Sequence, residues 1–353
     1  MHFSDLSVGY SFEMTNRVSQ APVSELPHRR STDFLATPVK ILNMPNLSPL
    51  IVILGPTASG KTGLALTLAK KFDGEIINAD SRQIYKEMDI ATNKISGASV
   101  VKKIIGNETV YFTDDIPTYL LDLINPSEKF SLADYKPAAL EKIKEIQSRD
   151  KLPILTGGTG LYISAIVDNL DIPKAPSDEK LRAELEEKDV KELFDELRKI
   201  DPVSAENIGV NNKRKIIRAL EVCKTTREVF SFQQKKGKPL FNILQIGIAI
   251  ERKELYAKID KRVDEMMKAG LVEETKRLAK KYDSSLPAMS GIGYKEISSY
   301  FRKEISLEEA VQQIKFHTHQ YARRQITWFK RDKNIHWVNN HSEAKGLVSE
   351  FIK

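Results

Sequence analysis

The chain of 353 residues has little cysteine, little tryptophan and no long apolar run. Its single cysteine, Cys223, excludes an intrachain disulfide and is typical of a reducing compartment, so we expect the protein in the cytoplasm. A membrane-spanning helix needs about 18 or more consecutive apolar residues. The longest apolar run, around residues 243–250, has the length of a strand. We therefore expect no membrane segment, and we expect a monomer.

The net charge points to a type of partner, and the composition separates the N-terminal residues from the rest of the chain. A net charge of +7 favours a polyanionic partner, although ordinary enzymes also carry such a charge. The first 47 residues mix Ser, Pro and Thr with charges of both signs and lack periodicity, which predicts a disordered extension. The expected parts are an N-terminal extension (1–47), an α/β core (48–172 and 241–338), a helical insertion (173–240) and a C-terminal tail (339–353).

The strongest motif is a phosphate-binding loop that follows an apolar run. Residues 50–54 have the pattern of a strand buried on both faces, and the next residues have the form G-x-x-x-x-G-K-T. The loop consists of Gly55, Pro56, Thr57, Ala58, Ser59, Gly60, Lys61 and Thr62. Backbone N–H groups of such loops surround phosphate oxygens at a helix N-terminus, and the threonine hydroxyl is the usual Mg²⁺ ligand. The motif predicts a bound di- or triphosphate but not its reaction.

A polar segment follows the next predicted strand. Ile76 and Ile77 form a short buried strand, which places Asp80 and Ser81 at its carboxyl end. Because the carboxyl ends of parallel strands form the ligand crevice of an open sheet, we expect Asp80 to face the phosphate loop. The residues alone leave two roles equally open for Asp80, one in catalysis and one as the N-cap of a following helix.

Further strands and glycines complete the predicted core. Residues 152–156 are a strand that runs into Gly157-Gly158-Thr159-Gly160, whose glycines allow close backbone approach near the first loop. Residues 119–124 are another strand candidate, in which Asp122 would be the magnesium-binding acid of an NTPase, with Asp114 as the second candidate. The order of strands and helices predicts a doubly wound parallel sheet of the P-loop NTPase type with a helical insertion.

Two basic segments lie in the second half of the chain. Residues 212–224 are predicted as a helix with four basic residues between Lys213 and Arg218, beside an apolar face. Residues 306–332 are predicted as a long helix that ends in R-R-Q-I-T-W-F-K-R. Basic groups interleaved with Trp328 suit contacts with phosphates and bases. The competing interpretation is a solvated basic face with its aromatic residues in the core.

These motifs leave three functions open. The first is a kinase or NTPase, which is disfavoured because neither Asp114 nor Asp122 follows a run of four apolar residues. The second is an RNA-modifying transferase that holds a diphosphate leaving group in the loop. The third is a non-catalytic RNA-binding module with a nucleotide switch.

A set of ordered segments resembles the tRNA dimethylallyltransferase family. The segments are Gly55–Thr62, Asp80-Ser81-Arg82-Gln83-Ile84-Tyr85, Gly157-Gly158-Thr159-Gly160-Leu161-Tyr162, Arg218-Ala219-Leu220-Glu221, Gly293-Tyr294-Lys295 and Arg324-Gln325-Ile326-Thr327-Trp328-Phe329. The resemblance spans about residues 50–338. It implies that dimethylallyl diphosphate occupies the phosphate loop and that N6 of adenosine 37, beside the tRNA anticodon, attacks its allylic C1. Enzymes that prenylate free adenine nucleotides share this loop and are the nearest alternative, whereas the two basic segments favour tRNA.

The resemblance also implies roles for individual residues. Asp80 would be the general base, while Lys61 and Thr62, the latter with Mg²⁺, would neutralise the diphosphate. The residues implied in binding the anticodon stem-loop are Asp80, Ser81, Arg82, Gln83, Thr159, Arg182, Arg214, Lys215, Arg218, Gly293, Tyr294, Lys295, Arg323, Arg324, Gln325, Trp328 and Lys330. The chain lacks the histidines that the family usually has at residues 115–119 and 209–212, so no histidine is assigned a role.

Overall fold

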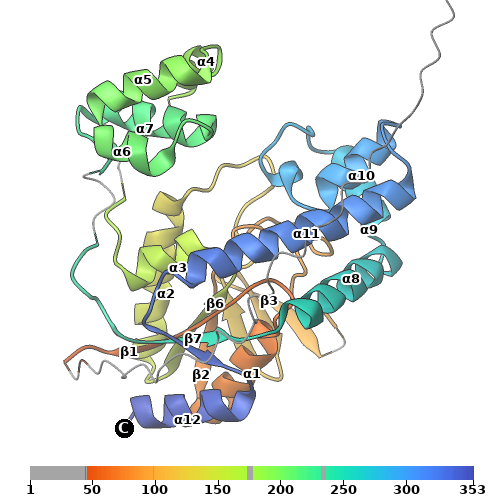
Figure 1. Ribbon diagram of the computed structural model, residues 1–353. Helices are drawn as coiled ribbons and strands as arrows, with labels where there is room; N and C mark the ends of the chain where they lie inside the picture. The colour runs from red at the N-terminus through yellow and green to blue at the C-terminus, as the bar shows by residue number, and fades with distance from the viewer. Residues whose placement is uncertain (1–43, 45, 98, 173–177, 232–235) are drawn as a thin grey trace, which may run out of the picture. The chain divides into compact units, whose positions relative to one another are not determined.

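The computed structural model describes residues 44, 46–97, 99–172, 178–231 and 236–353 (Figure 1). Most of the predicted N-terminal extension lies outside these residues. The described part contains a mixed α/β core and a group of four helices, α4 to α7. None of its helices combines the length and the apolar character needed to cross a membrane.

The core is built on one eight-stranded sheet with the strand order β3-β4-β5-β2-β6-β1-β7-β8. The strands are β1 (Pro49–Leu54), β2 (Gly74–Asn78), β3 (Val100–Ile105), β4 (Glu108–Thr113), β5 (Ile116–Tyr119), β6 (Leu152–Gly157), β7 (Asn242–Ile248) and β8 (Ile335–Val338). The strands from β5 to β8 in this order pair in parallel, whereas β3 and β4 form an antiparallel hairpin at one edge. The mostly parallel sheet confirms the predicted fold class.

Helices cover both faces of this sheet. The helices that pack on the sheet are α1 (Lys61–Phe72), α2 (Leu132–Ser148), α3 (Gly160–Val167) and α12 (His341–Phe351). The other helices of the core are α8 (Arg252–Lys268), α9 (Leu271–Ala279), α10 (Tyr294–Phe301) and α11 (Leu307–Phe329), which pack mainly against one another. Because side chains alternate along a strand, Val52 of β1 packs in one apolar cluster with α2 and α3, while Ile53 packs in another with α1 and α12. The helix α11 packs against α8 and α10 (Figure 1).

Four helices form the predicted helical insertion. They are α4 (Glu179–Glu186), α5 (Val190–Ile200), α6 (Pro202–Ile208) and α7 (Lys213–Thr226). They enclose an apolar cluster of their own, in which Leu193, Leu197 and Leu220 are fully buried. The insertion therefore has its own small core, as the amphipathic pattern of its helices requires.

The structure differs from the sequence analysis in two segments. The strand expected over residues 119–124 ends at Tyr119, because Leu120 and Asp122 adopt left-handed φ angles of 61° and 53° that a strand cannot contain. The residues set apart as a C-terminal tail instead form α12, whose Val348 and Phe351 are buried against the sheet.

Candidate active site

The phosphate loop connects β1 to α1 at the carboxyl edge of the sheet. Gly60 is the N-cap of α1 and has a φ of 95°, which a residue with a side chain rarely adopts. The Ser59 hydroxyl is buried without a hydrogen-bond partner, and the Lys61 Nζ donates to the Pro56 carbonyl at 2.7 Å. A buried hydroxyl and a buried ammonium group next to helix N–H groups are the donors that a phosphate anion needs.

Burial changes the proton affinity of Lys61. It lowers the pKa of the Lys61 ammonium group from 10.5 to about 8, while the negative charge of Asp80 acts in the opposite direction. The ammonium ion therefore lacks full charge compensation in this structure. An anion bound in the loop would supply it.

Asp80 follows β2 and presents one carboxylate oxygen to the site. Its Oδ1 accepts the backbone N–H of Arg82 at 2.9 Å, which fixes the rotamer of the side chain. A β-carbon added at Gly158 would lie 3.9 Å from the other oxygen, Oδ2, so Oδ2 faces this glycine. The residues after Asp80 form a turn rather than a helix, and the N-cap role considered for Asp80 is therefore wrong.

The turn after β6 supports the Asp80 segment. The Thr159 Oγ1 accepts the backbone N–H of Ser81 at 2.9 Å, which ties the two loops together. At Gly160 a β-carbon would lie 2.4 Å from the indole of Trp328, so only glycine lets the indole approach this backbone. At Gly157 a β-carbon would lie 2.1 Å from the carbonyl oxygen of Ala79. The glycines thus allow close approach, but to the backbone of Ala79 and the indole of Trp328 rather than to the phosphate loop near which it was predicted.

Arg262 is a site residue that the sequence analysis missed. It lies on α8, where its Nη1 donates to the Thr57 hydroxyl of the phosphate loop at 3.3 Å. Burial lowers the pKa of its guanidinium group, which stays charged because arginine starts at 12.5. The sequence contained a signal for it: Arg262 is flanked by Ile259 and Met266 at helical spacing, so a cation interrupts the apolar face.

Residues from the phosphate loop, the Asp80 segment, the turn after β6 and α8 line one cavity of about 580 Å³. Thr57, Asp80 and Arg262 contribute polar atoms to its wall, while Val263 and Ile314 contribute apolar ones. Tyr321 of α11 also lines it, and burial together with the charge of Asp80 raises the pKa of its hydroxyl. A cavity with charged groups beside apolar surface suits a substrate that has a charged end and a hydrocarbon end.

The two acids considered for an NTPase do not line this cavity. The buried carboxylate of Asp122 accepts hydrogen bonds from Lys94 at 2.5 Å, from Tyr111 at 2.8 Å and from Lys102. Its pKa is lowered although burial alone would raise it, because the two ammonium groups stabilise the charge. Asp122 is therefore occupied in a structural network, which argues against the NTPase.

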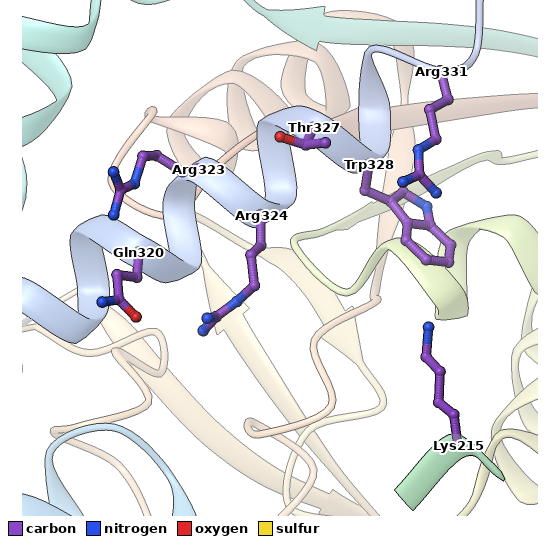
Figure 2. A pocket seen from close by; sticks show the side chains of 7 residues that line it. All are labelled: Lys215, Gln320, Arg323, Arg324, Thr327, Trp328 and Arg331. Atoms are coloured by element: carbon purple, nitrogen blue, oxygen red, sulfur yellow. The ribbon is translucent and has the colours of Figure 1, made fainter. Parts of the chain in front are cut away.

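A second, strongly basic pocket of about 430 Å³ lies beside the C-terminal half of α11 (Figure 2). Its lining consists of Lys215, Gln320, Arg323, Arg324, Thr327, Trp328 and Arg331. It contains four cations and no acid, and Arg324 and Trp328 also line the first cavity. The structure thus brings together the ends of both predicted basic segments. Gln320, Thr327 and Arg331 were not among the predicted contacts.

Other residues predicted to bind tRNA have partners inside the protein. The Glu221 carboxylate is fully buried and accepts hydrogen bonds from the guanidinium groups of Arg182 at 2.8 Å and Arg218 at 2.6 Å. Because Arg182 lies on α4 and Glu221 on α7, the first of these bonds joins the two helices. Arg214 and Lys215 of the same helix are exposed. The roles of all four in tRNA binding stay predictions.

The predicted Gly293–Lys295 contact and its neighbours are also interconnected. Tyr294 is buried, and its hydroxyl donates to Glu274 at 2.6 Å, while Lys295 is exposed. Arg82 donates to the carbonyl of Pro287 at 2.6 Å. The Gln83 amide donates to two backbone carbonyls, at Thr92 and Asn93. These bonds hold the loops around the cavity. Two other predicted contacts are exposed: Arg323 lies on α11, and Lys330 is the residue at its C-terminal end.

The residues present fit a magnesium ion that accompanies a diphosphate. Among the described residues no cluster of three or more His, Cys, Asp or Glu side chains could hold a metal by itself. Thr62 is exposed at the start of α1, three residues after Ser59, whose hydroxyl is buried without a hydrogen-bond partner. Mg²⁺ keeps several waters and takes only one or two protein oxygens when phosphate supplies the rest, so Thr62 can hold it in this way.

The sheet order, the phosphate loop after β1 and the Asp80 carboxylate after β2, which is separated from β1 by β6 alone, define a P-loop α/β protein with a substrate cavity. The model of the family described as IPP transferase matches residues 83–332. The chain belongs to this family.

Curated relatives match most of the chain. The tRNA dimethylallyltransferase of Acetivibrio thermocellus is 46% identical over 298 residues, which are 82% of this chain and 91% of the relative. That of Dehalococcoides mccartyi is 44% identical over 312 residues, which are 86% of this chain and 92% of the relative.

Solved structures share the fold. The tRNA isopentenylpyrophosphate transferase of Bacillus halodurans aligns with a TM-score of 0.63 and 37% identity, over 86% of this chain and 95% of its own. A eukaryotic dimethylallyltransferase acting on tRNA aligns with a TM-score of 0.68 and 27% identity, over 83% of this chain and 74% of its own.

Proposed function

We propose that this protein transfers the dimethylallyl group of dimethylallyl diphosphate to N6 of adenosine 37 in the anticodon stem-loop of tRNA. The observation that carries the proposal is the cavity in which the Asp80 carboxylate, the phosphate loop and Arg262 meet beside apolar side chains. The names of the relatives and the family membership of the chain support the same reaction. The products are N6-(dimethylallyl)adenosine and diphosphate.

The phosphate loop and Arg262 hold the leaving group. As the bond between C1 and the diphosphate oxygen breaks, negative charge grows on the diphosphate. The loop N–H groups, the Lys61 ammonium group and the Arg262 guanidinium group are donors already in place for this charge, so little reorganisation is needed. Magnesium held by Thr62 would add positive charge at the same oxygens. The apolar wall around Val263 and Ile314 suits the hydrocarbon part of the substrate.

Asp80 activates the amine. An exocyclic adenine amine is a weak nucleophile, and it must lose a proton as the new C–N bond forms. The Asp80 Oδ2 accepts this proton, while its Oδ1 stays on the backbone N–H of Arg82. A general base of this kind contributes about 10²–10⁴-fold to the rate. The electron pair of the broken C–O bond leaves with the diphosphate, so atoms and charges balance.

The tRNA reaches the cavity past the basic pocket. The target base must leave the anticodon-loop stack to enter the cavity, as in other enzymes that modify bases. The cations around Trp328 provide sites for phosphates of the loop, and the indole provides a surface for stacking (Figure 2). The four cations of this pocket favour tRNA over a free nucleotide as the acceptor. We expect the protein to act on tRNA in the cytoplasm, as a monomer.

The test is an assay with two acceptors. The purified protein is incubated with dimethylallyl diphosphate, Mg²⁺ and an equimolar mixture of unmodified tRNA and AMP, and products are identified by nucleoside mass spectrometry. We expect N6-(dimethylallyl)adenosine in the tRNA digest alone. Prenylated AMP with unchanged tRNA would instead identify an adenylate isopentenyltransferase. In a parallel reaction that also contains ATP, hydrolysis of ATP without prenyl transfer would identify an NTPase.

A further inference from the structure

Gln325 connects three parts of the site. The sequence analysis expected it among the tRNA contacts, but its side chain is buried, with 5% of the residue exposed. Its Oε1 accepts the backbone N–H of Thr57 in the phosphate loop at 2.8 Å. Its Nε2 donates to the carbonyl of Gly158 in the second glycine turn at 2.8 Å. The residue lies on α11, one position after Arg324 of the basic pocket.

The two bonds require a side chain that accepts at one atom and donates at another. Thr57 offers a donor and Gly158 offers an acceptor, so the side chain between them must accept at one atom and donate at the other. A β-carbon at Gly158 would lie 2.3 Å from the Gln325 Nε2, so this approach also depends on the glycine. Two buried hydrogen bonds with fixed partners hold the phosphate loop and the glycine turn at one separation.

We propose that Gln325 is a positioning residue that sets the distance between the phosphate loop and Asp80. Asp80 Oδ2 faces Gly158, whose carbonyl Gln325 holds, and the leaving group would sit in the loop whose Thr57 it holds. The side chain thereby sets the line along which the amine approaches C1. Small displacements of reacting groups cost large factors in rate. The inference rests on the proposed function and adds a residue to its mechanism.

The test exploits the likeness between an amide and a protonated carboxyl group. In Gln325→Glu the neutral carboxyl group can accept a hydrogen bond from the Thr57 N–H and donate one to the Gly158 carbonyl. The ionised carboxylate has no donor, so its second oxygen would face the Gly158 carbonyl oxygen without a hydrogen bond. Because burial raises the pKa of a carboxyl group above its ordinary value of about 4.3, acidic buffer restores the neutral form. We measure kcat and KM for tRNA and dimethylallyl diphosphate from about pH 6 to about pH 8.5, because rising pH favours the carboxylate over the neutral acid.

Two further variants serve as controls. Gln312→Glu introduces the same charge at an exposed position of the same helix, outside the cavity. Gln325→Met keeps the approximate volume but makes neither bond and does not titrate. Thermal unfolding of each variant separates misfolding from misplacement.

The expected result is a pH-dependent loss of turnover. The kcat of Gln325→Glu should fall at least tenfold relative to the unmodified protein at the alkaline end and recover severalfold at the acidic end. Gln325→Met should be low throughout, and Gln312→Glu should match the unmodified protein. Full turnover of Gln325→Met, or a loss confined to the KM for tRNA, would overturn the proposal. If the unmodified protein forms no prenylated tRNA, the proposed function fails, whatever the variants do.

Discussion

The cavity and the helical insertion both gather charged residues, but they use the charges differently. In the cavity, Thr57, Asp80 and Arg262 come from separate parts of the chain and line space that a substrate can fill. In the insertion, Arg182 and Arg218 converge on Glu221 and cancel its charge within the protein. We expect substitutions in the cavity to change turnover and substitutions around Glu221 to change stability.

The two basic helices show the same contrast at the level of sequence. Both α7 and α11 contain closely spaced cations, yet Arg218 of α7 binds a buried acid, whereas Arg323 and Arg324 of α11 line a pocket that contains no acid. A cluster of basic residues in a sequence therefore does not by itself identify a nucleic-acid surface. Whether a basic side chain is free to bind nucleic acid depends on the partners that it has inside the folded protein.

Asp80→Asn should have the largest effect. The amide can still accept the Arg82 N–H, but it cannot take the proton of the amine. We expect kcat to fall by about 10²–10⁴-fold, which is roughly 3–5 kcal/mol of barrier, with tRNA affinity unchanged. Single-turnover kinetics and a tRNA binding titration measure the two quantities. Turnover at the rate of the unmodified protein would remove Asp80 as the base.

Arg262→Gln should have the next largest effect. The substitution removes a buried charge that touches the phosphate loop at Thr57. A hydrogen bond to a charged group contributes about 1.5–3 kcal/mol, so kcat/KM for dimethylallyl diphosphate should fall about 10–100-fold. Arg252→Gln, at an exposed position at the start of the same helix, is the matched control. Equal kinetics of the two variants would contradict the role of Arg262.

Arg182→Ala should act on stability instead. Its guanidinium group makes two bonds to the buried Glu221, although its side chain is 42% exposed, and solvent screening reduces their effect. We expect a loss of about 1–2 kcal/mol in the free energy of unfolding. Urea unfolding measures this loss. A large change in the salt dependence of tRNA binding, without a change in stability, would instead make Arg182 a phosphate contact.

Arg324→Ala and Lys215→Ala should weaken tRNA binding moderately. Each lost phosphate contact lowers the slope of log affinity against log salt by about one. Filter binding over a range of KCl concentrations gives this slope. Both residues would belong to the solvated surface if the slope stayed the same.

The pH dependence of diphosphate binding should be the smallest effect. Burial lowers the pKa of Lys61 to about 8, and a bound anion favours its charged form and raises that pKa. The charge contributes fully to affinity below pH 8 and is lost as the pH rises through the pKa of the complex. Above about pH 8, affinity for inorganic diphosphate should fall by up to about tenfold per unit, and binding should take up a proton. Calorimetry in buffers of different ionisation enthalpy detects this uptake.

The local parts of this account could be predicted from the sequence. The buried strand before Gly55 and the glycine turn after β6 have specific patterns, and Asp80 follows from the rule that parallel strands place their carboxyl ends together. The pairing of Arg182 with Glu221 could not be predicted, because it depends on how α4 packs on α7. The strand misplaced at residues 119–124 shows a related limit, since left-handed φ angles at non-glycine residues leave no clear mark in the composition.

The contacts made by α11 at the centre of the site could also not be predicted from the sequence. The motif R-Q-I-T-W-F was predicted to contact tRNA as a unit. In the folded chain the helix divides it: Arg324 and Trp328 line the basic pocket, while Gln325 points inward to Thr57 and Gly158. Helical periodicity predicts that neighbours face different directions, but not what they meet there.

The most direct test of the central claim uses two tRNA transcripts that differ only at position 37. One carries adenosine there and the other carries guanosine, and each is incubated with the protein, Mg²⁺ and dimethylallyl diphosphate. The account predicts one dimethylallyl group, located at N6 of adenosine 37 by mass spectrometry of the digested loop, and none on the guanosine transcript. Equal prenylation of both transcripts, or of neither, would contradict it.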